Sequence, residues 1–93
     1  MKVRKHRSVD AAIRTLDEDE RGKVDDWLRH LEHWETDERV RHLSTLIMAP
    51  DVYALDTTDD LKIFFKLDLP NELISIWDIA KPSRFKQALA ASG

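Results

Sequence analysis

The spacing of apolar residues changes at Pro50 and divides the sequence into two halves. Before Pro50, apolar residues recur every three or four positions, which is the spacing of one face of an α-helix. After Pro50, they mostly alternate with polar residues, as they do along a β-strand that has one buried face. The sequence therefore predicts an α+β domain in which helices pack on one face of a sheet.

Three helical stripes precede Pro50. The first follows Ser8, which we expect to be the helix N-cap. The second starts at Asp17, and Glu20 stands three residues later, which is the spacing of a capping box. The third follows residues 36–38 and ends before Pro50, which cannot continue a helix. The apolar members of the three stripes are Val9, Ala12, Ile13 and Leu16, then Val24, Trp27, Leu28, Leu31 and Trp34, then Val40, Leu43, Leu46 and Ile47.

The segment from Val52 to Ile79 is predicted to form a three-strand antiparallel meander, because two polar turns separate three apolar runs. The last run is apolar on both faces, so we expect it inside the sheet with Trp77 in the core. Residues 1–7 alternate weakly, as a short edge strand would, and Pro82 suits the first turn of a short C-terminal helix. No linker or internal repeat is present, so residues 1–93 are expected to form one domain with a sheet of three or four strands.

The middle run of the meander carries the most distinctive surface pattern. Lys62, Phe64 and Lys66 stand at period two, so they share one face of the predicted strand. An aromatic ring between two lysines is unusual on an outer face. One interpretation is structural, with Lys66 paired to Asp56 or Asp78 on a neighbouring strand. The other interpretation is a face that contacts phosphate, with Phe64 packed on a base or on a partner helix.

Two more cations follow the last predicted strand. Lys81 and Arg84 could extend the same cationic patch. A helix that starts near residues 82–83 would also favour an anion at its N-terminus.

Composition narrows the classes of function. Hydrophobic residues (42%) and charged residues (35%) occur in the proportions of a soluble globular protein. The net charge of -3 argues against a dedicated nucleic-acid binder, although cations crowd the start of the chain. These cations are Lys2, Arg4, Lys5 and Arg7. Cysteine is absent, which excludes disulfides and thiolate metal sites, and no apolar run approaches the ~18 residues of a membrane span. We therefore expect a cytoplasmic protein without a membrane partner.

Other chemistry-bearing residues are interpreted as structural. His30 and His33 stand three apart, a spacing that can bring two imidazoles to one metal, but no third ligand is marked. Neither a metal nor a cofactor is therefore predicted. The carboxylate pair at residues 25–26 falls on a helix surface, and the pair at residues 59–60 falls in a turn, where Asp is favoured.

The order and pattern of these elements resemble the RelE/ParE toxin superfamily of bacterial toxin–antitoxin modules. The resemblance covers most of residues 8–82, in pattern rather than in an invariant motif. Three segments of the sequence show the resemblance. The first runs from Leu43–Ile47 through Pro50 to Val52–Leu55, the second is Asp60–Phe65, and the third is Leu73–Pro82. It implies an N-terminal helical hairpin packed on one face of a twisted antiparallel sheet.

The resemblance also implies a function, namely the toxin component of a type II toxin–antitoxin module. A RelE-like toxin would be an mRNA endoribonuclease that acts on the ribosome. Carried over by position, Lys62, Lys81 and Arg84 would hold and polarise the phosphate, and Lys66 and Phe64 would contact the RNA.

Two alternatives to RNA cleavage remain open. The chain could be a toxin-family protein that acts by binding, either as a ParE-like inhibitor of DNA gyrase or as a member that only engages its antitoxin. It could also be a solitary interaction domain. The toxin interpretations imply a small, partly disordered antitoxin as partner, and the acidic balance also permits a homodimer.

Overall fold

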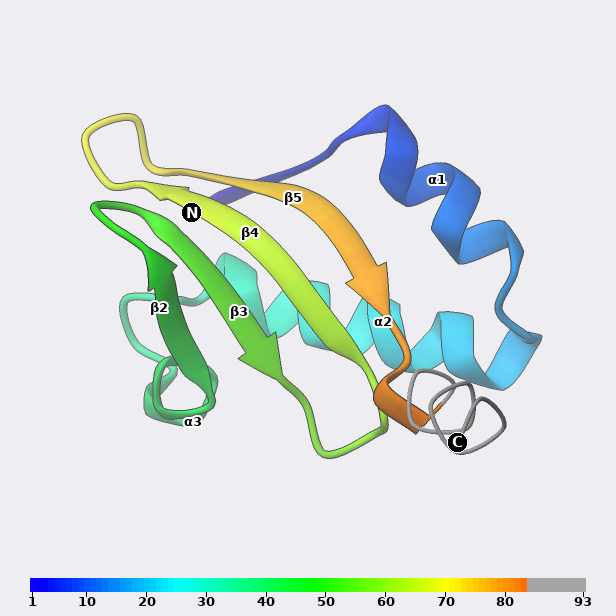
Figure 1. The fold of residues 1–93 in the computed structure, drawn as a ribbon. Coiled ribbons are helices and arrows are strands. Elements are labelled where there is room, and N and C mark those ends of the chain that lie inside the picture. Colours follow the sequence, from blue (N-terminus) through cyan, green and yellow to red (C-terminus); the bar gives the residue numbers. More distant parts are fainter. Residues whose placement is uncertain (84–93) are drawn as a thin grey trace, which may run out of the picture.

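A five-stranded mixed sheet with a long helix across one face forms the body of the fold, seen in a computed structural model that describes residues 1–83 (Figure 1). The predicted α+β class is confirmed. The elements are β1 (Lys2–Lys5), α1 (Arg7–Arg14), α2 (Glu18–Glu32), α3 (Glu38–His42), β2 (Ser44–Met48), β3 (Val52–Asp56), β4 (Lys62–Asp68) and β5 (Leu73–Ala80). Among these residues, no helix is both long enough and apolar enough to cross a membrane.

The strand order is β1-β5-β4-β3-β2. The predicted meander is confirmed, because β3, β4 and β5 pair antiparallel in sequence order. The edge strand predicted at the start of the chain is also present, but β1 pairs parallel with β5, so the sheet is mixed rather than antiparallel. Between β1 and β5 the chain forms the three helices and then β2, β3 and β4, and the strands return one by one across the sheet until β5 lies beside β1.

The expected count of three or four strands is wrong, because the third helical stripe is mostly a strand. Helix α3 stops at its C-cap Leu43, and Ser44–Met48 pair with β3 as β2. Within five residues a helical stripe and an apolar strand have nearly the same sequence pattern. Pairing with β3 satisfies the backbone of this segment, and Leu46 and Ile47 end up exposed rather than on a buried helix face.

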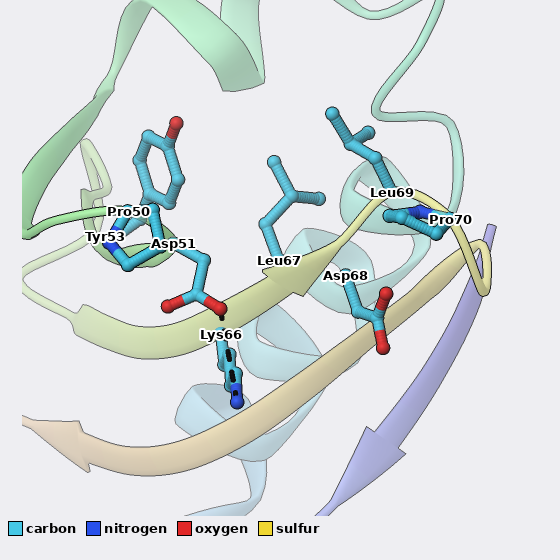
Figure 2. Close-up of a pocket in the computed structure, with 8 residues that line it drawn as sticks. All are labelled: Pro50, Asp51, Tyr53, Lys66, Leu67, Asp68, Leu69 and Pro70. Carbon is cyan, nitrogen blue, oxygen red and sulfur yellow. Dashed lines mark ion pairs between the residues drawn. The ribbon is translucent and has the colours of Figure 1, made fainter.

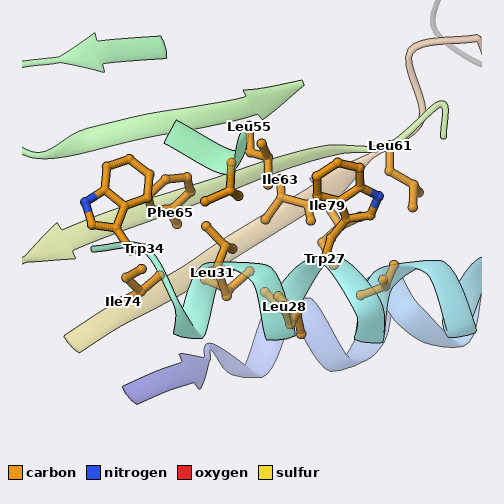
Figure 3. Packing of buried hydrophobic residues seen from close by; sticks show 14 of the residues in the cluster. Trp27, Leu28, Leu31, Trp34, Leu55, Leu61, Ile63, Phe65, Ile74 and Ile79 are labelled. Atoms are coloured by element: carbon orange, nitrogen blue, oxygen red, sulfur yellow. The ribbon is translucent and has the colours of Figure 1, made fainter. Parts of the chain in front are cut away.

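Helix α2 supplies one side of the core and the sheet supplies the other (Figure 3). The predicted capping box is confirmed, since Asp17 Oδ1 accepts from the Glu20 amide at 2.8 Å and Glu20 Oε1 accepts from the Asp17 amide at 3.1 Å. Trp27 and Trp34 lie in the core, as expected. The Trp34 ring meets Phe65 edge-on, with ring centroids 5.7 Å apart. The largest fully buried side chains are Phe65, Leu31, Leu55, Leu61, Ile63, Ile74 and Ile76.

Helix α1 continues along β5 beyond the point where β1 ends (Figure 1). Its N-cap is His6 rather than the predicted Ser8. The Ser8 hydroxyl instead donates to the carbonyl of Trp77 at 2.9 Å and ties the helix to β5. Val9, in the first turn of α1, is fully buried. The helix thus covers the part of the β5 edge that β1 leaves free.

The prediction that Trp77 lies in the core is wrong. The β4–β5 register pairs Phe64 with Asp78 and Phe65 with Ile76, so Trp77 is an extra residue at a β-bulge. A bulge breaks the alternation of faces from which its position was predicted. Its side chain is 48% exposed and stacks on the His6 ring, with centroids 4.8 Å apart.

Candidate functional site

The strand β4 presents Lys62, Phe64 and Lys66 on the same face of the sheet, as the sequence predicts. The residues between them, Ile63 and Phe65, are fully buried toward α2. Helix α2 lies behind the sheet in Figure 1, and no helix within residues 1–83 lies over the other side. Lys62 Nζ stands 5.9 Å from the centroid of the Phe64 ring, within the range of a cation–π contact.

Both lysines of this face are paired with carboxylates. Lys62 Nζ lies 3.5 Å from Asp56, directly opposite on β3, and Lys66 Nζ lies 3.8 Å from Asp51. The expectation that Lys66 would pair with Asp56 or Asp78 is wrong, because the register puts Lys66 opposite Val52 and Ser75. Each ion pair leaves the local charge near zero, so this face is less cationic than the sequence pattern implies.

Lys81 does not join this face. Its ammonium group pairs with the Glu20 carboxylate in the first turn of α2, so its side chain turns toward the helix-covered side. The two side chains are only 20% and 16% exposed. Arg84 lies outside the described residues. Of the two predicted catalytic cations that the structure describes, only Lys62 therefore lies on the Phe64 face.

A carboxylate in the β3–β4 turn holds the chain that follows Lys81. Asp60, which has a left-handed backbone (φ 57°), accepts from the Ser83 amide at 3.0 Å and also from the Ser83 hydroxyl. These hydrogen bonds, the hydroxyl first, lower the pKa of Asp60 below its ordinary value, and Lys81 acts in the same direction. The turn carboxylates thus have the structural role that the sequence predicts.

The surface that sequence reasoning missed is β2, at the outer edge of the sheet. Its side chains Leu46, Ile47 and Met48 are 46%, 53% and 66% exposed. Within residues 1–83 only β3 pairs with β2, so the other edge of its backbone has no strand partner in this part of the chain. The signal was present as three consecutive large apolar residues, a run that a helix buried on one side cannot cover completely.

A cavity of about 380 Å³ opens where the turn before β3 meets the turn after β4 (Figure 2). Its lining is mostly apolar, with Lys66 and its partner Asp51 at one side. Tyr53 connects the cavity to β2, because it pairs with Leu46 across the strands. The full lining is Pro50, Asp51, Tyr53, Lys66, Leu67, Asp68, Leu69 and Pro70.

The two histidines of α2 have separate surroundings. His30 Nδ1 lies 2.7 Å from Asp37 Oδ2, and the His30 ring packs beside the Trp27 ring. His33 is exposed at the helix C-cap. Within residues 1–83, no three His, Cys, Asp or Glu side chains are grouped so that they could hold a metal ion.

Comparison of the chain with protein-family models, with curated proteins and with solved structures finds no match. The features of the molecule that bear on function are the exposed β2 edge and the Phe64 face.

Proposed function

We propose that the chain is a protein-binding domain that acts without catalysis, and that its partner adds a strand at β2. The observation that carries the proposal is the run Leu46–Met48, in which three large apolar side chains are exposed on a strand edge that no segment of residues 1–83 pairs with. Backbone groups on such an edge bind an extended segment by main-chain hydrogen bonds, and exposed apolar side chains add buried area.

The opposite edge of the sheet makes the contrast clear. Strand β1 carries Lys2, Arg4 and Lys5, and charged side chains on an edge discourage strand addition. Strand β2 carries no charged residue between Ser44 and Met48. This asymmetry favours β2 as the edge that accepts a partner.

Among the interpretations of the family resemblance, this proposal agrees with those that act by binding. The partner could be an antitoxin-like protein, and inhibition of DNA gyrase would also need only binding. The pairing of Lys62 with Asp56 and of Lys81 with Glu20 weakens the case for a cationic catalytic set.

Site-specific photo-crosslinking in cells tests the proposal. Ile47→p-benzoylphenylalanine is expected to form a protein adduct of discrete mass on irradiation. The matched control is Asp25→p-benzoylphenylalanine, because Asp25 is exposed on α2 on the other layer of the fold. Absence of an adduct at position 47, or identical adducts at both positions, would refute the proposal.

A second candidate function is ribosome-dependent cleavage of mRNA, and the Phe64 face is the observation that favours it. Lys62, Phe64 and Lys66 lie side by side on a face without a covering helix in residues 1–83, where the lysines could exchange their carboxylate partners for RNA phosphates.

Mapping of RNA 5′ ends after induced expression tests the second candidate. Cuts inside codons that disappear in Lys62→Ala/Lys66→Ala, but persist in the exposed-cation control Arg29→Ala, would support cleavage. Growth arrest with intact mRNA would exclude it, and DNA-damage signalling in those cells would indicate gyrase as the target.

A further inference from the structure

We infer that the segment which adds to β2 is the β2 strand of a second copy of this chain, paired antiparallel about a two-fold axis near Leu46. The inference deepens the proposed function and rests on it. The resulting dimer would join two five-stranded sheets edge to edge into one continuous sheet.

The backbone of β2 is prepared for this pairing. Asp56 donates its amide to the carbonyl of Leu43 at 3.0 Å, and the register then runs without a shift to Leu46, after which a bulge shifts it by one residue at Met48. In an antiparallel ladder, hydrogen-bonded and non-bonded positions alternate. Leu43 and Thr45 therefore bond to β3, while Ser44 and Leu46 direct their N–H and C=O groups outward.

A two-fold axis at Leu46 satisfies the outward groups of Leu46 itself. Leu46 would exchange both of its main-chain hydrogen bonds with Leu46 of the second copy, whereas the bulge after Leu46 keeps Met48 paired with Val52 on β3. Such an interface is isologous, because the same patch serves both subunits and the assembly closes at two. Burial of Leu46, Ile47 and Met48 in each copy would supply apolar area to the contact.

The charges at the two ends of β2 are complementary in this arrangement. Arg41 is exposed in the last turn of α3, just before β2, and Asp51 follows β2 with a side chain that is 31% exposed and that pairs with Lys66 within the same copy. Antiparallel pairing brings the start of one strand beside the end of the other, so Arg41 of each copy approaches Asp51 of its neighbour. Parallel pairing would bring Arg41 beside Arg41, which costs free energy. This pattern favours a second copy over an unrelated extended segment.

Sedimentation velocity of the purified full chain, from about 1 µM to about 1 mM, tests the inference over the range in which small interfaces associate. The wild type is expected to shift from monomer to dimer. Leu46→Lys should weaken the dimer at least tenfold, because each interface would bury two ammonium groups face to face. Since Leu46 is half exposed in the monomer, circular dichroism should find the variant folded.

The matched control is Leu69→Lys, which changes a leucine that is 55% exposed in the loop after β4 and not on strand β2. It should dimerise like the wild type. Equal loss in both variants would indicate unspecific apolar association and would overturn the inference, as would a wild type that stays monomeric at every concentration.

A charge exchange gives an independent test of the antiparallel register. Arg41→Asp should weaken the dimer, and Arg41→Asp/Asp51→Arg should restore part of the lost affinity. Failure of the double variant to recover would contradict the proposed register.

The mass of the adduct at position 47 separates the two proposals. A species of twice the 10.9 kDa chain supports both. An adduct with a different protein overturns the second-copy inference and leaves the strand-addition proposal standing. Absence of any adduct removes both.

Discussion

Single polar side chains determine where the short helices of this fold begin. Asp37 is the N-cap of α3, where its Oδ1 accepts from the Val40 amide at 3.0 Å and its Oδ2 lies 2.7 Å from His30. These contacts, the Val40 amide first, lower the pKa of Asp37 below its ordinary 3.8. A carboxylate whose pKa is lowered by folding stabilises the folded state above its ordinary pKa and loses that contribution as pH falls through the folded pKa.

Replacement of Asp37 is therefore expected to cost more at neutral pH than in acid. At pH 7, Asp37→Ala should lower the free energy of unfolding by about 1 kcal/mol, which is typical of a lost N-cap. Urea titrations should find this difference shrinking once the pH falls below 3.8 toward the folded pKa. Asp25→Ala, on the exposed face of α2, should change stability little at either pH, and a pH-independent loss in Asp37→Ala would contradict the argument.

At this scale, sequence reasoning succeeds where partners are close in the chain. The Asp17–Glu20 capping box is a local motif, and it was predicted correctly. The N-cap at His6 was missed because Ser8 is the commoner capping residue and is engaged by Trp77, 69 residues away. A bond of that kind is set by tertiary structure and has no local signature.

The elements differ in how clearly their sequence specifies them. Strand β4 has seven residues of clean alternation, and its buried face was predicted correctly. Strand β2 has five residues that continue a helical stripe, so both periods fit and the helix was predicted wrongly. The bulge at Trp77 adds one residue to β5 and so interrupts the alternation of buried and exposed side chains. A prediction from alternation alone cannot locate such a bulge.

Neighbouring phenylalanines on β4 allow a direct test of its two faces. Phe65 is fully buried against Trp34 and Tyr53, so Phe65→Ala should cost about 3–5 kcal/mol of unfolding free energy. Phe64→Ala, one position away on the uncovered face, should cost about 1 kcal/mol. Equal losses in chemical denaturation would mean that Phe64 is packed as tightly as Phe65.

The whole molecule is held together by contacts between distant segments. The Trp27 indole donates to Asp59 Oδ2 at 2.8 Å and joins α2 to the β3–β4 turn, and Arg39 lies over the same ring at 5.3 Å. The parallel pairing of β1 with β5 spans almost the entire described chain. Sequence periodicity predicts the meander of β3, β4 and β5, but it holds no information on pairings between distant segments, so the place of β1 beside β5 could not be predicted.

The contribution of the Trp27–Asp59 hydrogen bond to stability can be measured by comparing Trp27→Phe with Trp34→Phe. Trp27→Phe should lose the hydrogen bond as well as ring volume, whereas Trp34→Phe loses ring volume alone, because the Trp34 indole N–H makes no hydrogen bond within residues 1–83. We expect Trp27→Phe to be less stable than Trp34→Phe by about 1–2 kcal/mol in urea unfolding. Equal stability would show that the bond contributes nothing to the folded state.

The lysines and arginine of β1 have a consequence for growth of larger aggregates. A sheet whose two edge strands can both pair with other molecules can grow without limit into a fibre. In this fold the β1 edge is positively charged, and α1 covers the part of the β5 edge that β1 leaves free. A copy that is paired through its β2 edge therefore exposes only its β1 edge, whose like charges repel further copies. The protein can therefore expose the apolar side chains of β2 to water without forming amyloid-like fibres.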